Sequence, residues 1–116
     1  MNPVAKLNDS FRARIGLPDS GRPIAPGAFF ITRGIAELPE TAQVAILARV
    51  RAFCEFGEDN DPWDERDFGA FTLKGLGKFF WKIDYYASSE MWEAAEDPGD
   101  PAKSFRVLTI MFADEW

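Results

Sequence analysis

The residues best suited to chemistry form an acidic block between positions 55 and 67, EFGEDNDPWDERD. Seven carboxylates fall in this block, and Arg66 is the only basic residue among them. Carboxylate oxygens are the ligands that Mg²⁺ and Ca²⁺ prefer in proteins, so this spacing could gather a hard cation. The carboxylates that alternate in the way such a site needs are Asp59, Asp61, Glu65 and Asp67.

The block nevertheless departs from the pattern of a calcium-binding loop. Pro62 and Trp63 stand where a ligand loop needs flexibility and glycine, and no glutamate follows at the offset of a bidentate ligand. Runs of charge usually mark turns and solvated surfaces, which is the simpler interpretation of this segment. We therefore predict no metal site and no cofactor.

A second polar group falls on two predicted strands. Lys82, Asp84 and Tyr86 alternate along one strand, and Arg106 lies on the neighbouring one. Such a cluster could bind an anion or transfer a proton. The interpretation we favour is a ladder of ion pairs on an open sheet face, each pair contributing roughly a few tenths of a kcal/mol.

The composition excludes several classes of protein. The chain has no histidine, which rules out Ser-His and Cys-His catalysis and histidine-ligated zinc. Cys54 is the only cysteine and lies in an apolar helical pattern, so we expect a buried, inert thiol in a reducing compartment. The first residues lack the apolar core of a signal peptide, and no apolar run approaches the roughly 18 residues of a membrane span. We expect a cytoplasmic protein that does not bind a membrane.

The helices and strands that must position these residues follow an α-β-α-β-β-β order within a single domain, residues 1–116. Val4, Leu7, Phe11 and Ile15 recur at helical spacing, which predicts a short helix over residues 4–16. This helix and a connector rich in proline and glycine make up residues 1–27, and an α+β core follows over residues 28–116.

The core contains one long predicted helix and about four strands. A broad apolar stripe through Val44, Leu47, Val50 and Cys54, with Ile46 and Phe53 beside them, predicts the helix over residues 39–56. The predicted fold is α+β: an antiparallel sheet, including a three-stranded C-terminal meander, packed against this helix. The predicted strands cover residues 28–36, 68–73, 78–86 and 105–113.

Strand periodicity assigns the side chains of residues 79–86 to two faces of the sheet. Successive side chains of a strand point to opposite faces. We expect the helix-covered face to take Phe79, Trp81, Ile83 and Tyr85, and the open face to take Phe80, Lys82, Asp84 and Tyr86.

Two tryptophans lie in acidic segments, where burial is least expected for so large a side chain. Trp63 falls in the first block, and Trp92 falls in SSEMWEAAEDPGDPAK. Aromatic side chains rimmed by charge are typical of interface hot spots, although a loop tryptophan can also fold back onto its sheet. The predicted partner-binding residues are Asp59, Asp61, Trp63, Asp64, Glu65, Asp67 and Trp92.

Several motifs resemble a bacterial family of domains of unknown function, family 3768. They are LNDSFR, FGEDNDPWDERDFGAF, FFWKIDYY, EDPGDP and RVLTIMFADEW, and they span most of the chain. The resemblance carries no activity with it. It implies a small cytosolic bacterial protein of a kind encoded on plasmids, prophages or other mobile DNA. The matching positions at which it would place a site are Asp59, Asp61, Pro62, Asp67, Phe68, Gly69, Trp81, Lys82, Asp84 and Tyr85.

Charge distribution leads to the main functional hypothesis. Residues 1–54 have a balance of +3, whereas residues 55–116 have six basic and fifteen acidic residues, a balance of -9. An acidic surface repels nucleic acid and attracts basic proteins. We expect a non-catalytic module that binds a basic protein surface. The more specific version of this hypothesis is a DNA-mimic inhibitor of a nucleic-acid-binding protein, such as an anti-CRISPR or anti-restriction factor. The alternatives are a small carboxylate- or divalent-metal-dependent enzyme and an oligomeric structural protein.

Overall fold

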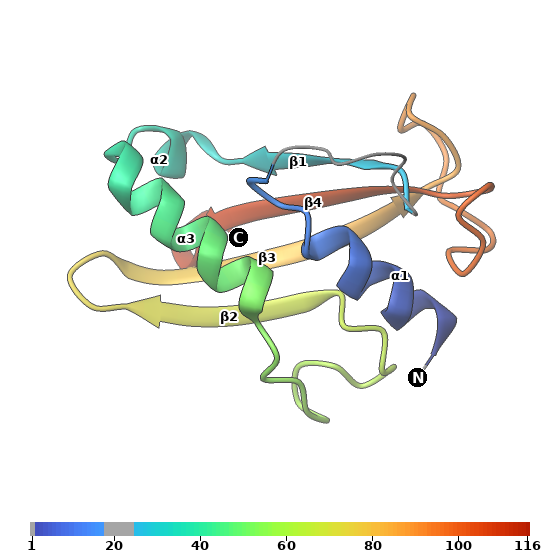
Figure 1. Cartoon of the computed structure of the whole chain (residues 1–116), viewed down its shortest axis with the longest axis horizontal. Coiled ribbons are helices and arrows are strands. Elements are labelled where there is room, and N and C mark those ends of the chain that lie inside the picture. The colour runs from blue at the N-terminus through green and yellow to red at the C-terminus, as the bar shows by residue number, and fades with distance from the viewer. Residues whose placement is uncertain (1, 18–24) are drawn as a thin grey trace.

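The computed structural model describes residues 2–17 and 25–116 and consists of two layers. A four-stranded sheet in the order β1-β4-β3-β2 forms one layer, and α1 and α3 lie together across one of its faces (Figure 1). The elements are α1 (Pro3–Arg12), β1 (Gly27–Ile31), α2 (Arg33–Ala36), α3 (Glu40–Ala52), β2 (Phe68–Leu73), β3 (Gly77–Tyr86), β4 (Phe105–Phe112) and the short 3-10 helix η1 (Ala113–Glu115). The α+β class is therefore confirmed.

The sheet is mixed, so the prediction of a purely antiparallel sheet is wrong. The β2-β3-β4 meander is antiparallel, but β1 pairs with β4 in parallel, with Gly27 opposite Arg106 and Ile31 opposite Ile110. The cause is the number of chain reversals. The helical segment after β1 returns the chain to its starting end, so β2 runs in the direction of β1. Two further reversals give β4 that direction as well.

The central helix is shorter than predicted, and only part of its predicted apolar stripe is buried. α3 has 13 residues, an ordinary helix length, because Phe53 adopts extended backbone angles and ends it. Ile46 and Val50 are buried in the core, whereas Val44 is 60% exposed. Cys54 lies beyond the end of the helix and is exposed, so the predicted buried thiol is also wrong.

Two other predicted elements end earlier in the structure. β1 stops at Ile31, and the rest of the predicted strand forms α2, which begins after Thr32. α1 covers Pro3–Arg12, and Asn2 caps it by accepting a 2.8 Å hydrogen bond from the Val4 backbone N–H. Residues 18–24 of the predicted connector lie outside the described residues.

The predicted alternation of β3 is confirmed. Phe79, Trp81 and Ile83 are buried in the core beneath the helices, while Lys82 and Asp84 are partly exposed. Gly69 lies opposite Trp81 in the sheet, and a Cβ at this position would clash with the indole. The core therefore uses a glycine to admit its largest side chain.

Two arginines fix the helices to each other. The buried Arg12 of α1 donates hydrogen bonds to the carbonyl oxygens of Val50 and Phe53 at the end of α3, at 2.8 and 2.7 Å. In return, Arg51 of α3 donates to the carbonyl oxygen of Ile15, just beyond α1, at 2.8 Å. Each helix thus supplies a cation to a chain segment whose carbonyls carry partial negative charge.

No helix in the described part of the chain has the length and apolar character needed to cross a membrane.

Candidate functional site

The two acidic segments lie at the same end of the sheet. Residues 55–67 lead into β2, and residues 87–104 connect β3 to β4. Since β2 and β4 begin where β3 ends, both segments leave the sheet at that end; in Figure 1, residues 55–67 extend below the sheet and residues 87–104 extend to the right. We call residues 55–67 and 87–104 together the acidic end. It contains twelve acidic residues against Arg66 and Lys103, a balance of -10 in a chain of net charge -6.

The first turn of α1 lies between the two segments of the acidic end. Asn2 lines a cleft formed with residues 56–66. On the other side, a Cβ placed on Gly99 would lie within 4 Å of the Pro3 and Val4 side chains. The two segments therefore share a surface with the start of α1 rather than projecting independently.

A buried polar network anchors both segments from below. The fully buried Arg106 donates to Asn8 Oδ1 at 2.6 Å and to the carbonyl oxygen of Pro98 at 2.5 Å. Asn8 in turn donates to the carbonyl oxygen of Glu65 at 2.9 Å and to the hydroxyl of Tyr85 at 2.7 Å. One asparagine and one arginine thus hold each acidic segment to α1 and to the sheet.

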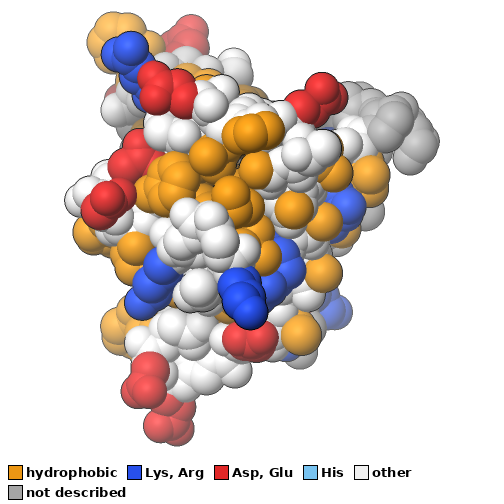
Figure 2. All heavy atoms as spheres, turned by 90° about the vertical axis from the view of Figure 1, so that its left-hand side faces the viewer, with side chains coloured by type: hydrophobic (Ala, Val, Ile, Leu, Met, Phe, Trp, Pro, Cys, Tyr) orange, Lys and Arg blue, Asp and Glu red, His pale blue; other side chains and the backbone are white. Residues whose placement is uncertain are grey.

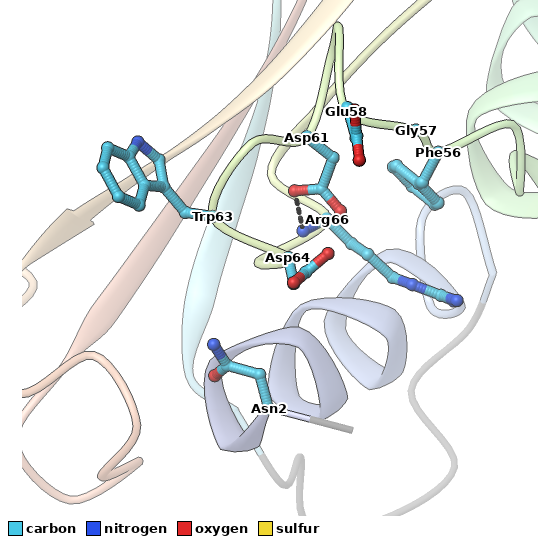
Figure 3. Close-up of a pocket in the computed structure, with 8 residues that line it drawn as sticks. All are labelled: Asn2, Phe56, Gly57, Glu58, Asp61, Trp63, Asp64 and Arg66. Atoms are coloured by element: carbon cyan, nitrogen blue, oxygen red, sulfur yellow. Dashed lines mark hydrogen bonds between the residues drawn. The ribbon is translucent and has the colours of Figure 1, made fainter.

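The structure corrects the role predicted for Asp61. This side chain is only 6% exposed, and its Oδ1 accepts hydrogen bonds from the backbone N–H groups of Glu65 and Arg66, both at 2.9 Å (Figure 3). A carboxylate that satisfies two backbone donors is shaping its own turn. Asp61 therefore stabilises its own turn and leaves little of its surface exposed, in contrast to the exposed position predicted for it.

A cleft of about 590 Å³ opens beside Asp61. In Figure 3, Glu58 and Asp64 extend into the space between the loop and α1, while the indole of Trp63 points away from the other side chains. Phe56 and Arg66 also line the cleft, and in Figure 3 their side chains lie on the side away from Trp63. The lining residues are Asn2, Phe56, Gly57, Glu58, Asp61, Trp63, Asp64 and Arg66.

Arg66 does not neutralise the acidic segments. Its guanidinium forms a 3.0 Å ion pair with Asp9 of α1 and lies 5.1 Å from the ring centre of Phe56. Among the carboxylates of residues 55–116, only that of Asp84 forms an ion pair within the described part of the chain. The exposed carboxylates of Glu58, Asp59 and Asp64 therefore keep their charges unpaired there.

Two carboxyl groups at the base of the acidic end are partly desolvated. Burial is the main cause that raises the pKa of Glu65 and of Asp67, and the negative charge of Asp61 raises both further. The Asp67 carbonyl oxygen also accepts a 2.8 Å hydrogen bond from the Ile83 backbone N–H, which extends the pairing of β2 and β3. These two acids are less available to a partner than the exposed ones.

The backbone of the acidic end is strained at three positions. Asp64, Arg66 and Met91 have φ values of 55°, 57° and 58°, and they are the non-glycine residues of the described chain with positive φ. Such a conformation costs on the order of 1 kcal/mol for a residue other than glycine and persists only where surrounding contacts impose it. Two of the three residues line the cleft, and the third precedes Trp92.

Both tryptophans of the acidic end extend into solvent. Trp63 is 78% exposed and Trp92 is 85% exposed, and neither stacks on another ring of the described chain. Folding back onto the sheet, the alternative interpretation of a loop tryptophan, does not occur for either one. Each presents most of an indole beside unpaired carboxylates.

The predicted cluster on the sheet is divided between two faces. Lys82 and Asp84 form a 2.9 Å ion pair on the open face, where Tyr86 is partly exposed. Arg106 is paired with Tyr85 across the sheet and lies on the helix-covered face, so it does not join them. A catalytic group of all four residues is therefore excluded by their positions. In the described residues, no set of three or more acidic or cysteine side chains converges in the manner of a metal site.

The opposite end of the molecule has a different character. Figure 2 shows hydrophobic side chains gathered there among lysines, arginines and acidic residues. A cleft of about 400 Å³ at this end lies between the β2-β3 hairpin and η1. Its lining residues are Leu76, Gly77, Lys78, Phe112, Ala113 and Asp114. Charges of both signs occur here, in contrast to the acidic end.

Sequence reasoning missed Trp116 and Asn8. Trp116 is 68% exposed and meets the rings of Phe68 and Phe80 edge-on, at 5.5 and 5.6 Å between ring centres. Its position after two acidic residues is the same signal that identified Trp63 and Trp92. Asn8 carries no such signal, because its role depends on Arg106, 98 positions away.

Comparison with known proteins identifies a family and no activity. No curated protein matches the chain, and no solved structure matches it either. Residues 31–115 match the family described as "Protein of unknown function (DUF3768)". This match covers most of the chain, including β2 to β4 and the whole acidic end. The chain therefore belongs to the DUF3768 family.

Proposed function

We propose that this protein is a non-catalytic interaction module whose acidic end binds a basic surface of another protein. The observation that carries the proposal is the pairing of two indoles, each more than three quarters exposed, with carboxylates that have no cationic partner in the described chain. The partner is expected to present lysine or arginine side chains around an apolar patch.

Electrostatics supports this choice of partner. A balance of -10 concentrated at one end attracts cations over a Debye length of about 10 Å at 0.1 M salt. It also speeds the encounter with a basic protein and disfavours nucleic acid and acidic surfaces. The carboxylates in the best position to act are those exposed at the tip of the first segment, Glu58, Asp59 and Asp64.

The two tryptophans add apolar contact area, which charged side chains alone do not provide. An indole buried in an interface contributes apolar area, and a lysine or arginine over its face adds a cation–π contribution of about 0.5–2 kcal/mol. Trp63 and Trp92 lie on different segments of the acidic end, so a partner that contacts both must span the surface around the start of α1. The buried Asn8–Arg106 network supports this surface and limits its rearrangement.

The test is affinity capture from an extract of the source organism by four immobilised proteins: the wild type, Trp63→Ala/Trp92→Ala, Glu58→Lys/Asp59→Lys and a control. The control, Glu37→Lys/Asp114→Lys, makes the same charge change with exposed residues outside the acidic end. We expect the same basic proteins on the wild type and the control, and their loss from both acidic-end variants. Partners retained equally by all four would contradict the proposal.

Added salt tests whether the interface is electrostatic, and added DNA tests whether the protein acts as a DNA mimic. Raising the salt from about 0.1 to 1 M shortens the Debye length from about 10 to 3 Å and should release a charge-directed partner. If the carboxylates stand in for nucleic-acid phosphates, a short DNA duplex competes with this chain for the captured protein. Release by salt without competition by DNA supports a basic partner of another class. Binding insensitive to salt would contradict an electrostatic interface.

A further inference from the structure

We infer that the open face of the sheet is a docking surface for a second copy of this chain, arranged so that the two acidic ends point in opposite directions. The surface is distinct from the acidic end and does not depend on the function proposed for it. α1 and α3 both pack on the other face of the sheet, which leaves this face without a helical layer in the described chain (Figure 1).

The open face is largely apolar. Residue pairing between strands places on it Ala28 and Phe30 of β1, Phe68 of β2, Phe80 of β3, and Val107 and Met111 of β4. Val107 and Met111 are already buried within the chain, at 7% and 4% exposed, so a partner would meet the side chains around them. Phe30 is among the large exposed hydrophobic side chains of the molecule. Sheets that are apolar on one side ordinarily bury that side against another layer, at a spacing of about 10 Å when the layer is a second sheet.

The C-terminal segment adds an ordered aromatic anchor to this face. Glu115 accepts hydrogen bonds from the Thr32 hydroxyl at 2.6 Å and from the Phe112 backbone N–H at 2.8 Å. These contacts hold η1 so that Trp116 lies over Phe68 and Phe80, with most of its surface in solvent. An exposed tryptophan that is fixed in position is typical of the residues that contribute most of the binding energy of a protein interface.

Charge complementarity selects a second copy as the occupant. The ionic groups at the centre of the face are Lys82 and Asp84, two positions apart on β3, with one charge of each sign. When two such faces meet about a two-fold axis that crosses β3 near Ile83, Lys82 of each copy faces the partner's Asp84. A strongly basic or strongly acidic partner would leave one of these two charges opposed by its own sign.

The same arrangement satisfies two further conditions. Pairing Lys82 with the partner's Asp84 requires the two β3 strands to run in opposite directions, so the acidic ends lie at opposite ends of the dimer and repel each other least. It also places Phe80, with Trp116 lying over it, opposite the partner's Tyr86, because Phe80 and Tyr86 each lie the same number of residues from Ile83. Like-sized aromatic side chains then meet across the interface.

Sedimentation and light scattering of the whole chain over a range of concentrations test the inference. The wild type is expected to reach twice the 13.1 kDa of a single chain. Lys82→Asp and Asp84→Lys each place like charges across the interface, and each should raise the dissociation constant of the dimer about tenfold or more. The double exchange Lys82→Asp/Asp84→Lys restores opposite charges across the two-fold axis and should return the constant to near the wild-type value.

Phe30→Lys provides an independent test, because this exposed edge position allows the variant to fold. It should also yield a monomer, and circular dichroism should verify that each variant is folded. Trp92→Ala is the matched control and should dimerise as the wild type does. A wild type that stays monomeric at high concentration overturns the inference, as does a dimer unaffected by Lys82→Asp, Asp84→Lys and Phe30→Lys.

Discussion

The acidic end and the open sheet face both expose tryptophan, but they hold it in opposite ways. Trp63 and Trp92 stand among unpaired carboxylates without a ring neighbour in the described chain, whereas Trp116 packs edge-on against two phenylalanines beside an ion pair. The first arrangement depends on a partner of opposite charge for its recognition. The second offers apolar area and nearly balanced charge. This difference is the basis on which we propose two surfaces with two kinds of partner.

The two surfaces are also supported differently. The acidic end is held mainly by buried polar groups, Asn8 and Arg106, together with the turn built by Asp61, and Phe56 packs against the core at its base. The open face is one side of a hydrogen-bonded sheet whose other side is the hydrophobic core. Substitutions in the polar supports should therefore disturb the acidic end more than the open face.

Loss of Arg106 should have the largest effect. Arg106→Ala leaves Asn8 Oδ1 and the Pro98 carbonyl without their donor and opens a cavity beneath both acidic segments. We expect a loss of about 3 kcal/mol in the free energy of unfolding, measured by urea denaturation. Hydrogen exchange should increase first in residues 87–104. Arg33→Ala, at an exposed surface pair, should change stability by less than about 0.5 kcal/mol.

Loss of Arg12 should have the next largest effect. Arg12→Ala removes the donors to the Val50 and Phe53 carbonyls at the end of α3 and leaves Asp9 with Arg66 as its remaining ionic partner. We expect a cost of about 2 kcal/mol by thermal or urea unfolding. Arg12→Lys should recover only part of it, because one ammonium cannot reproduce the guanidinium fork. Full recovery by lysine would contradict the capping role.

The tryptophans give a direct contrast between the surfaces. Trp116→Ala should lower the free energy of unfolding by about 1 kcal/mol, since it removes two edge-to-face contacts. Trp63→Ala and Trp92→Ala should each change it by less than about 0.5 kcal/mol, since their indoles have no ring contacts to lose in the described chain. Equal costs at all three positions would remove the distinction between the surfaces.

The pH dependence of stability should show the smallest effect. The pKa of Asp67 is raised by burial, so its ionised form opposes folding above the folded-state pKa, and this penalty disappears as the pH falls through that value. Asp67→Asn should therefore stabilise the protein at neutral pH, by less than about 1 kcal/mol, and should lose that advantage in acid. Urea unfolding of the wild type and of Asp67→Asn at several pH values measures the stabilisation at neutral pH and its loss in acid. A gain that persists unchanged in acid would contradict the burial of this carboxyl group.

Glu115 behaves in the opposite sense. Hydrogen bonds, above all the one from the Thr32 hydroxyl, lower the pKa of Glu115. The stability that the Glu115 carboxylate contributes is therefore present above its unfolded-state pKa and is lost as the pH falls through the lowered, folded-state pKa. Acid should therefore release η1 and Trp116 from the open face. Trp116 fluorescence is obscured by the other three tryptophans. Trp63→Phe/Trp92→Phe removes the two that are exposed and leaves the fully buried Trp81, so the exposed emission of this variant comes from Trp116.

Local sequence patterns were sufficient where short-range physics decides the structure. The alternation of residues 79–86 predicted which side chains face the core. The direction of β1 was not predictable in this way, because it depends on β1 adding beside β4 at the edge of the sheet. A strand's own residues do not encode that neighbour.

Single polar residues were the least predictable part of the site. Asp61 looked like its acidic neighbours in the sequence, yet it is buried because its Oδ1 meets the backbone N–H groups of Glu65 and Arg66. Arg106 looked like a surface cation on an alternating strand, yet it is buried against Asn8 from the other end of the chain. In both cases the decisive partner is defined only by the folded backbone.

Oxidative footprinting of the three exposed tryptophans tests the central claim most directly. The free protein and its complex with a captured basic partner would be labelled at a low concentration that keeps the chain monomeric. Our account predicts that Trp63 and Trp92 become protected in the complex, while Trp116 keeps its reactivity. If Trp63 and Trp92 remain as reactive in the complex as in the free protein, the acidic end is not the surface that binds the partner.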